Sequence, residues 1–275
     1  MGVFEIIKEA LRIARTHKSL WLFGFLAAFG GGGGGGGGGG VQVGPVPTTS
    51  PDLGAQLLLV GVVVLPAIVA FVILRYLSTG ALIEGVKRAR SNGSMTIGEG
   101  FREGWGHWGV LFRVGLLFVL MTFGSVAVLA APCVLVGRAF GSPAVFVAVG
   151  VAALVGVPWL LTLYMWQSFA ERIAVLENRH ALDAIRKARL FLHGRLHLGL
   201  KLVAAAFLCM LLVGALGILV VGPLVLLLRV TDALVAPVVV LGVLAVVPLV
   251  LVGYAFVGVT TSAVWTVGYL TQVEQ

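Results

Sequence analysis

Two histidines in the C-terminal half of the chain have the spacing of metal ligands. His193 and His197 are four residues apart, so on a continuous helix they would share one face, as zinc-binding histidines do. No glutamate follows His193 in the manner of a zinc metalloprotease, and the neighbouring sequence offers no obvious third ligand. Histidines beside lipid headgroups are the commoner explanation of such a pair, and we therefore predict no bound metal.

Other residue types that support catalysis do not occur in the required patterns. The chain has no Gly-x-Ser-x-Gly sequence, no cysteine pair at metal-ligand spacing and no evident pair of carboxylates in an apolar pocket. Cys133 and Cys209 fall inside apolar segments at different depths, where free cysteine usually behaves as a small apolar side chain. We therefore predict no catalytic residues and no cofactor, which leaves an unrecognised enzyme as a minor alternative.

An arginine between two small residues recurs three times, and it is the main candidate for binding chemistry. The small residues are four apart, so they share a helix face and allow another helix to approach closely. Chance explains one such pair in a chain rich in alanine and glycine, but three in register with an arginine favour packing. The candidate packing residues are Ala10, Ala14, Gly100, Gly104, Ala184 and Ala188, and the candidate lipid-facing residues are Arg12, Arg102 and Arg186.

The three copies indicate an internal repeat of about 90 residues. The motifs start 90 and then 84 residues apart, and Pro66, Pro158 and Pro248 keep nearly the same period at 92 and 90 residues. Each copy precedes a long apolar stretch. We predict one membrane domain over residues 1–275, built from repeat units 3–90, 95–178 and 180–272. Each unit is an interfacial amphipathic helix followed by a transmembrane hairpin.

Composition places the chain in the membrane. It is 59% hydrophobic and 11% charged, whereas about a quarter of the residues of a soluble domain are charged. Several apolar stretches exceed the ~20 residues that cross a bilayer as a helix. The predicted fold class is an all-α polytopic membrane protein with six spans, the first of them short. The apolar stretches are Ser19–Phe29, Leu53–Leu77, Val114–Val136, Pro143–Trp166, Leu202–Leu228 and Ala233–Trp265.

The basic residues predict the orientation. In this layout 17 of the 19 lysines and arginines fall on one side, and only Arg138 and Arg229 fall on the other. By the positive-inside rule both termini are cytoplasmic. The net charge of +8 therefore belongs to one face, where anionic lipid headgroups are the simplest partners. Nucleic acid is excluded as a partner, because the basic residues are spread over three helices with interleaved glutamates and no reading motif.

Several local signals predict where helices begin and end. The first interfacial helix spans residues 3–18 and the third spans about 181–196, while Thr96 and Glu99 have capping-box spacing. Residues 91–94 should end the helix that follows the second span. Glu84 and Glu177 either pair with arginines of the interfacial helices or are solvated.

Eleven consecutive glycines, Gly30–Gly40, follow the short first apolar segment. Glycine costs a helix about 1 kcal/mol per residue relative to alanine, whereas unpaired backbone in hydrocarbon costs more. The run either completes the first span or forms a loop. We predict a helix to about Gly30 or one turn beyond, and then irregular backbone near the outer side of the first hairpin.

The pattern from Ala10 to Leu26, Ala-Leu-Arg-x-x-Arg-x-His-Lys-x-Leu-Trp-Leu-Phe-Gly-Phe-Leu, resembles uncharacterised bacterial six-helix membrane proteins. These are similar to the group related to the membrane domain of glycerophosphodiester phosphodiesterases. The resemblance covers the layout of the whole chain and implies a bacterial inner-membrane protein. The chain lacks the soluble catalytic domain of those phosphodiesterases, so no catalytic residue carries over.

Two functional classes follow. The first is a non-catalytic scaffold or accessory subunit that binds anionic lipid and protein partners, either other membrane-protein subunits or further copies of this chain. The second is a transporter or channel-like protein for a small or lipidic molecule. No ionisable residue falls in the middle of a predicted span, and the spans are almost uniformly apolar. We therefore expect the scaffold.

Overall fold

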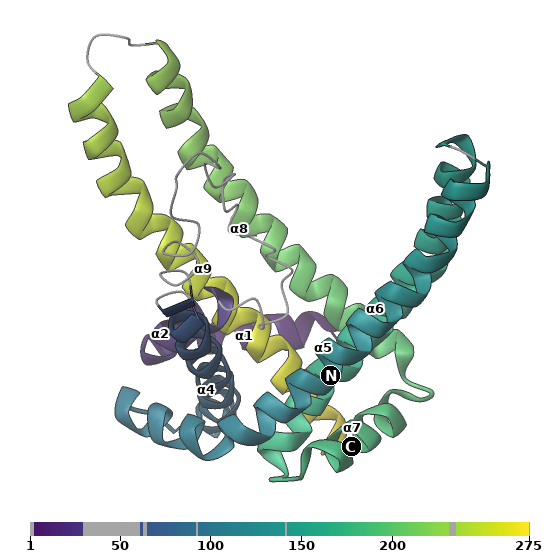
Figure 1. Cartoon of the computed structure of the whole chain (residues 1–275). Coiled ribbons are helices and arrows are strands. Elements are labelled where there is room, and N and C mark those ends of the chain that lie inside the picture. Colours follow the sequence, from purple (N-terminus) through teal and green to yellow (C-terminus); the bar gives the residue numbers. More distant parts are fainter. Residues whose placement is uncertain are drawn as a thin grey trace. The chain divides into compact units, whose positions relative to one another are not determined.

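The computed structural model describes residues 3–29, 61–62, 65–91, 93–140, 142–230 and 235–274. These residues form long helices and no strand (Figure 1). The helices are α1 (Val3–Thr16), α2 (Ser19–Phe29), α4 (Leu65–Arg90), α5 (Ile97–Phe140), α6 (Ser142–Leu176), α7 (Ala181–Leu192), α8 (Leu196–Val230) and α9 (Val235–Val273).

Four of these helices are long and apolar enough to cross a membrane. The candidate spans are Leu65–Arg90, Ile97–Arg138, Ala144–Leu176 and Pro248–Val273. A fifth results if α7 and the start of α8, which are bent by 102° relative to each other, are counted as one broken span. The all-helical, multi-pass prediction is therefore confirmed at this level. Six spans, the threefold repeat and cytoplasmic termini stay predictions, and Gly30–Gly40 lie outside the described residues.

Some of the predicted helix boundaries in the described residues are confirmed. Helix α2 covers the first apolar segment, and its predicted end near Gly30 lies outside the described residues. Helix α4 ends at Arg90, where the Gly93 amide donates to the Arg88 carbonyl over 2.9 Å. The capping box also forms, because the Thr96 amide donates to Glu99 Oε2 at 2.8 Å and the Glu99 amide to Thr96 Oγ1 at 3.4 Å. These ends are set by local chemistry.

Other boundaries differ from the prediction. Helix α1 ends at Thr16 and not at residue 18, and α7 ends at Leu192 and not at about residue 196. The second interfacial segment and the apolar segment after it form a single 44-residue helix, α5. In contrast, the third interfacial helix, α7, is separated from α8 by Gly194, whose φ of 86° is left-handed. No residue of α5 has a positive φ, so the helix continues.

The described helices divide into two compact units. The first consists of residues 1–108 and 204–275, and in it α9 packs against α1, α2 and α4. Its core includes Ile6, Phe23, Ile83 and Val259, all of which are buried. The C-terminal half of α9 is therefore a central packing element of this unit.

A crossing of two glycines brings α2 and α9 together. A Cβ atom added to Gly258 would overlap the carbonyl oxygen of Gly24, and one added to Gly24 would lie 2.5 Å from the Ala255 carbonyl oxygen. Next to this crossing, Trp21 and Phe256 meet edge to face with ring centroids 6.0 Å apart. Only residues without a side chain permit this approach.

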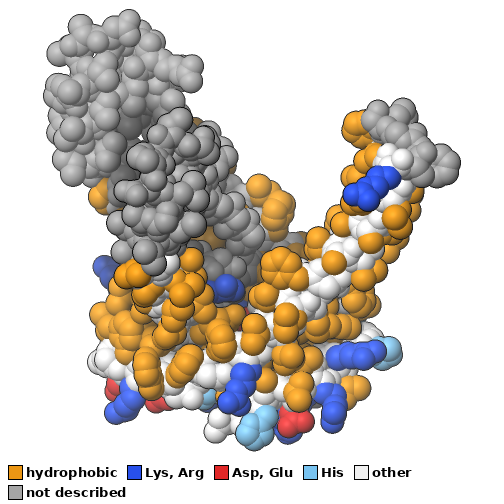
Figure 2. All heavy atoms as spheres, viewed as in Figure 1, with side chains coloured by type: hydrophobic (Ala, Val, Ile, Leu, Met, Phe, Trp, Pro, Cys, Tyr) orange, Lys and Arg blue, Asp and Glu red, His pale blue; other side chains and the backbone are white. Residues whose placement is uncertain are grey.

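The second unit, residues 109–203, contains most of α5, all of α6 and α7 and the start of α8. Helix α7 packs on α6, with the rings of Phe169 and Phe191 5.1 Å apart. Trp159 Nε1 donates to Ser125 Oγ at 2.9 Å and joins α6 to α5. Large apolar side chains along α5 and α6 are exposed, as Figure 2 shows; Phe146, for example, is 78% exposed.

The glycine crossing generates a test of stability. Gly258→Ala should lower the thermal midpoint of the detergent-purified protein, because the new methyl group forces α2 and α9 apart at a cost of about 1–3 kcal/mol. The matched control is Gly106→Ala on α5, where an added Cβ would meet no atom within 4 Å. That control should keep or slightly raise the midpoint. Equal midpoints for the two variants would contradict the crossing.

Candidate functional site

The first arginine motif lies on α1. Ala10 and Ala14 are completely buried, and Arg12 between them is exposed. The Ala14 carbonyl oxygen accepts a hydrogen bond of 2.7 Å from Trp21 Nε1, which fixes the start of α2 against the end of α1. The face of α1 that carries the two alanines is thus covered by protein, and Arg12 faces away from the packed helices.

The second motif lies at the start of α5. A Cβ on Gly100 would lie 2.6 Å from the ring of Phe23, and one on Gly104 would overlap the carbonyl oxygen of Leu77. Both glycines are buried, and Arg102 is exposed. Helix α5 therefore begins in tight contact with α2 and α4.

The third motif, on α7, has the same pattern in the other unit. Ala184 and Ala188 are completely buried, and Arg186 is exposed. Across the described residues, none of the three motif arginines forms an ion pair. The geometry provides three exposed guanidinium groups, each on the outer side of a helix that is packed through small residues. Their binding of lipid stays a prediction.

Three other cations of the first unit, Lys87, Arg88 and Arg90, are paired with carboxylates. Arg88 Nη2 lies 2.7 Å from Glu103 Oε1, an ion pair that joins α4 to α5. Glu84, which we expected to pair with an interfacial arginine or to be solvated, pairs with Lys87 and Arg88 of its own helix. The link between the helices therefore has the reverse polarity, with the arginine on α4 and the carboxylate on α5.

In the second unit, Glu177 does reach the interfacial helix. Its carboxylate oxygens lie 2.6 and 2.7 Å from Lys187 Nζ on α7, and Arg179 Nε lies 3.0 Å away. The partner on α7 is therefore a lysine and not an arginine. Arg186, which precedes Lys187 in the sequence, takes no part in this pairing and is exposed.

Sequence reasoning missed a cluster around Arg90. This arginine donates to both carboxylate oxygens of Glu274, at 3.1 and 2.9 Å, and its Nε lies 3.4 Å from Glu9 Oε1. The cluster ties the end of α4 to α1 and to the residue after α9. No local spacing signals such a contact, because Arg90 and Glu274 are 184 residues apart.

A buried ion pair on α6 was missed as well. The side chains of Glu171 and Arg172 are only 4% and 3% exposed, with Glu171 Oε2 3.7 Å from Arg172 Nη1. Gln167 Nε2 donates to Glu171 Oε1 at 3.1 Å, and Arg172 Nη1 donates to the Ser168 carbonyl oxygen. Arg172, counted with the cytoplasmic basic residues, is therefore not available to headgroups.

The two histidines with ligand spacing do not share a continuous helix. His193 is the C-cap of α7 and His197 lies in the first turn of α8, with Gly194 between them in the left-handed region. Within the described ranges, no group of three or more histidine, cysteine, aspartate or glutamate residues could hold a metal ion. The premise of a shared helical face is therefore wrong.

Substitution of Arg172, which is buried, and of Arg179, which is exposed, should have different effects on stability. Arg172→Leu should destabilise the purified protein by about 3–5 kcal/mol, because it leaves the buried Glu171 without this cation. Arg179→Leu makes the same change at a side chain that is 51% exposed, and its effect should be about 1 kcal/mol or less. Thermal midpoints in one detergent measure both. If the two variants lose the same stability, burial does not decide their contributions.

Comparison of the chain with protein-family models, with curated proteins and with solved structures gives no match. The resemblance to the membrane-domain group of the glycerophosphodiester phosphodiesterases therefore stays a prediction from the sequence.

Proposed function

We propose that this protein is a non-catalytic integral membrane scaffold or accessory subunit in a bacterial inner membrane, with both termini cytoplasmic. It binds anionic lipid through its interfacial helices and protein partners through its apolar helices. One observation carries the proposal: each of the three motif arginines is exposed and forms no ion pair with the residues that the structure describes, while the small residues beside it are buried.

Electrostatics supports lipid as the ligand of these arginines. A basic residue near an anionic membrane surface contributes about 1 kcal/mol to binding. Pairing with a protein carboxylate would cancel much of that attraction, as for Arg88 and Arg90. Arg12, Arg102 and Arg186 keep their charge available, and the buried small residues hold their helices in place.

The apolar surfaces support a location within the membrane and a role in assembly. Soluble proteins seldom expose contiguous apolar patches of more than a few hundred Å². Phe123, Val128, Phe146 and Leu154 on α5 and α6 are each more than 70% exposed. Acyl chains or the helices of a partner would cover such side chains.

Charge reversal tests the lipid-binding part. The triple variant R12E/R102E/R186E should reach the membrane fraction less efficiently and retain less phosphatidylglycerol after purification than the wild type. The control R12K/R102K/R186K keeps the charge and should retain nearly as much. Lipid extraction and mass spectrometry measure retention. A triple glutamate variant that inserts, purifies and holds lipid normally would show that these arginines have no such role.

Co-purification tests the assembly part. After gentle extraction into lipid nanodiscs, we expect a protein partner, or a second copy of the chain, in stoichiometric amount. Native mass spectrometry identifies it. A single chain that carries one defined small molecule would replace the scaffold with the transporter alternative.

A further inference from the structure

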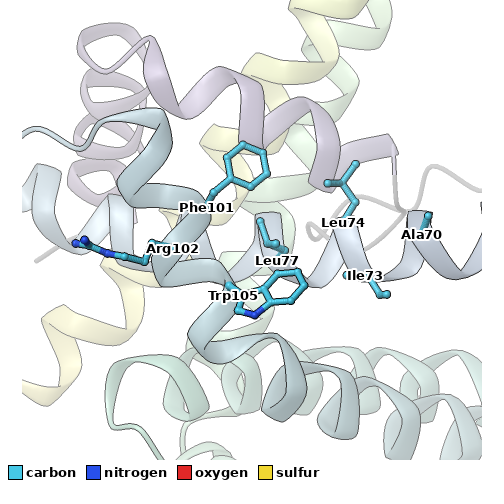
Figure 3. A pocket seen from close by; sticks show the side chains of 7 residues that line it. All are labelled: Ala70, Ile73, Leu74, Leu77, Phe101, Arg102 and Trp105. Atoms are coloured by element: carbon cyan, nitrogen blue, oxygen red, sulfur yellow. The ribbon is translucent and has the colours of Figure 1, made fainter.

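A groove between α4 and the start of α5 contains one of the three exposed arginines. Its volume is about 570 Å³. The lining residues are Ala70, Ile73, Leu74, Leu77, Phe101, Arg102 and Trp105 (Figure 3). All of them belong to the first compact unit. The groove exists because Gly104 lets α5 approach the α4 backbone at Leu77.

Polarity changes along this groove. Figure 3 shows Ala70 and Ile73 toward one end, Leu77 and Trp105 in the middle, and the Arg102 side chain extending away at the other end. Residues 70–77 of α4 extend for about 10 Å, at the rise of an α-helix. The groove therefore has an apolar part along α4 and a cationic end on α5.

The cationic end is available to a ligand. Arg102 is exposed and forms no ion pair in the described part of the chain. Glu99, one turn earlier on the same helix, is already hydrogen-bonded to the Thr96 amide in the helix cap. Glu103 is paired with Arg88 and is thus engaged. Glu99 forms the helix cap and is close enough to Arg102 for a coulombic interaction, but no ion pair joins them among the described residues.

Trp105 has the chemistry and exposure expected of a residue at the membrane interface. Its indole is 60% exposed beside the groove, and Trp108 follows with its ring centroid 6.1 Å from that of Trp105. Tryptophan is enriched at the depth of lipid headgroups, where its ring is partly apolar and its N–H can bind polar groups. The apolar α4 residues would then lie at acyl-chain depth.

We propose that this groove binds one anionic phospholipid, with an acyl chain along Ala70, Ile73, Leu74 and Leu77 and the phosphate at Arg102. The proposal rests on the membrane location given under the proposed function. Charge complementarity selects the occupant. An apolar groove that ends at the Arg102 guanidinium, which forms no ion pair with the described residues, fits a molecule with a long apolar tail and one negative headgroup. Among the lining side chains, only Arg102 and Trp105 offer polar atoms.

Photolabelling in membranes tests the site. The full chain is reconstituted into phosphatidylcholine vesicles that contain a trace of phosphatidylglycerol with a diazirine near the end of one acyl chain. Illumination should place the label on residues 70–77, as peptide mass spectrometry reports. A phosphatidylcholine probe of the same design should label these residues about fivefold less, the preference expected from one basic residue.

Two matched pairs of variants test the headgroup end and the acyl-chain end of the groove separately. Arg102→Gln should bring the labelling ratio of the two probes to about one, whereas Arg102→Lys should keep the preference. Ala70→Trp fills the apolar part and should abolish the label there. Val69→Trp adds the same bulk at an exposed neighbour outside the lining and should not. If Ala70→Trp does not reconstitute, the smaller Ala70→Leu replaces it.

The outcomes separate this proposal from the proposed function. Label spread over the exposed faces of α5 and α6 and unchanged by filling the groove would overturn the groove and leave the membrane location intact. Equal labelling by both probes in the wild type, or an unchanged preference in Arg102→Gln, would overturn the headgroup at Arg102. A chain that does not enter vesicles at all would overturn the proposed function itself.

Discussion

Close backbone approach at small residues is the constraint on which the packing of the first compact unit depends. Where Gly258 crosses Gly24, and where Gly104 meets the Leu77 carbonyl, no Cβ atom fits. In a membrane, where lipid tails are as apolar as leucine, such contacts supply van der Waals energy that hydrophobic burial alone does not. The same device holds α1 through its two buried alanines. Once these contacts form, the outer face of each short helix is determined, and the arginine on it points outward.

This packing divides the basic residues by their surroundings. Arg172 is buried beside Glu171, Arg88 and Arg90 are paired with carboxylates between helices, and the motif arginines are exposed. The net charge of +8 is therefore a poor measure of what a membrane surface would meet. Paired cations contribute mainly to the attachment of one helix to another. Cations that form no ion pair with the described residues, such as the motif arginines, keep more of their charge for an anionic ligand.

Local chemistry was predictable from the sequence, and contacts between distant residues were not. The end of α4 near Gly93 and the capping box at Thr96 follow from neighbouring residues, and both were predicted correctly. The break at Gly194 was not, because a glycine within a helical pattern does not reveal the sign of its φ. The contact of Arg90 with Glu274 joins residues 184 apart in the sequence, and the groove at Arg102 forms where two helices, α4 and α5, pack against each other. Periodicity within one helix contains no information about such meetings.

The three motifs are alike in packing but not in the surface that surrounds the arginine. Arg12 and Arg186 lie on short helices that end a few residues later, at Thr16 and Leu192. Arg102 lies on α5, which continues without a break and crosses α4 at Gly104. This crossing forms the apolar groove beside the Arg102 guanidinium. A repeated sequence pattern can therefore hold its helix in one way while the adjoining helices give each arginine different surroundings. The groove beside Arg102 depends on the crossing of α4 and α5, and not on the motif alone.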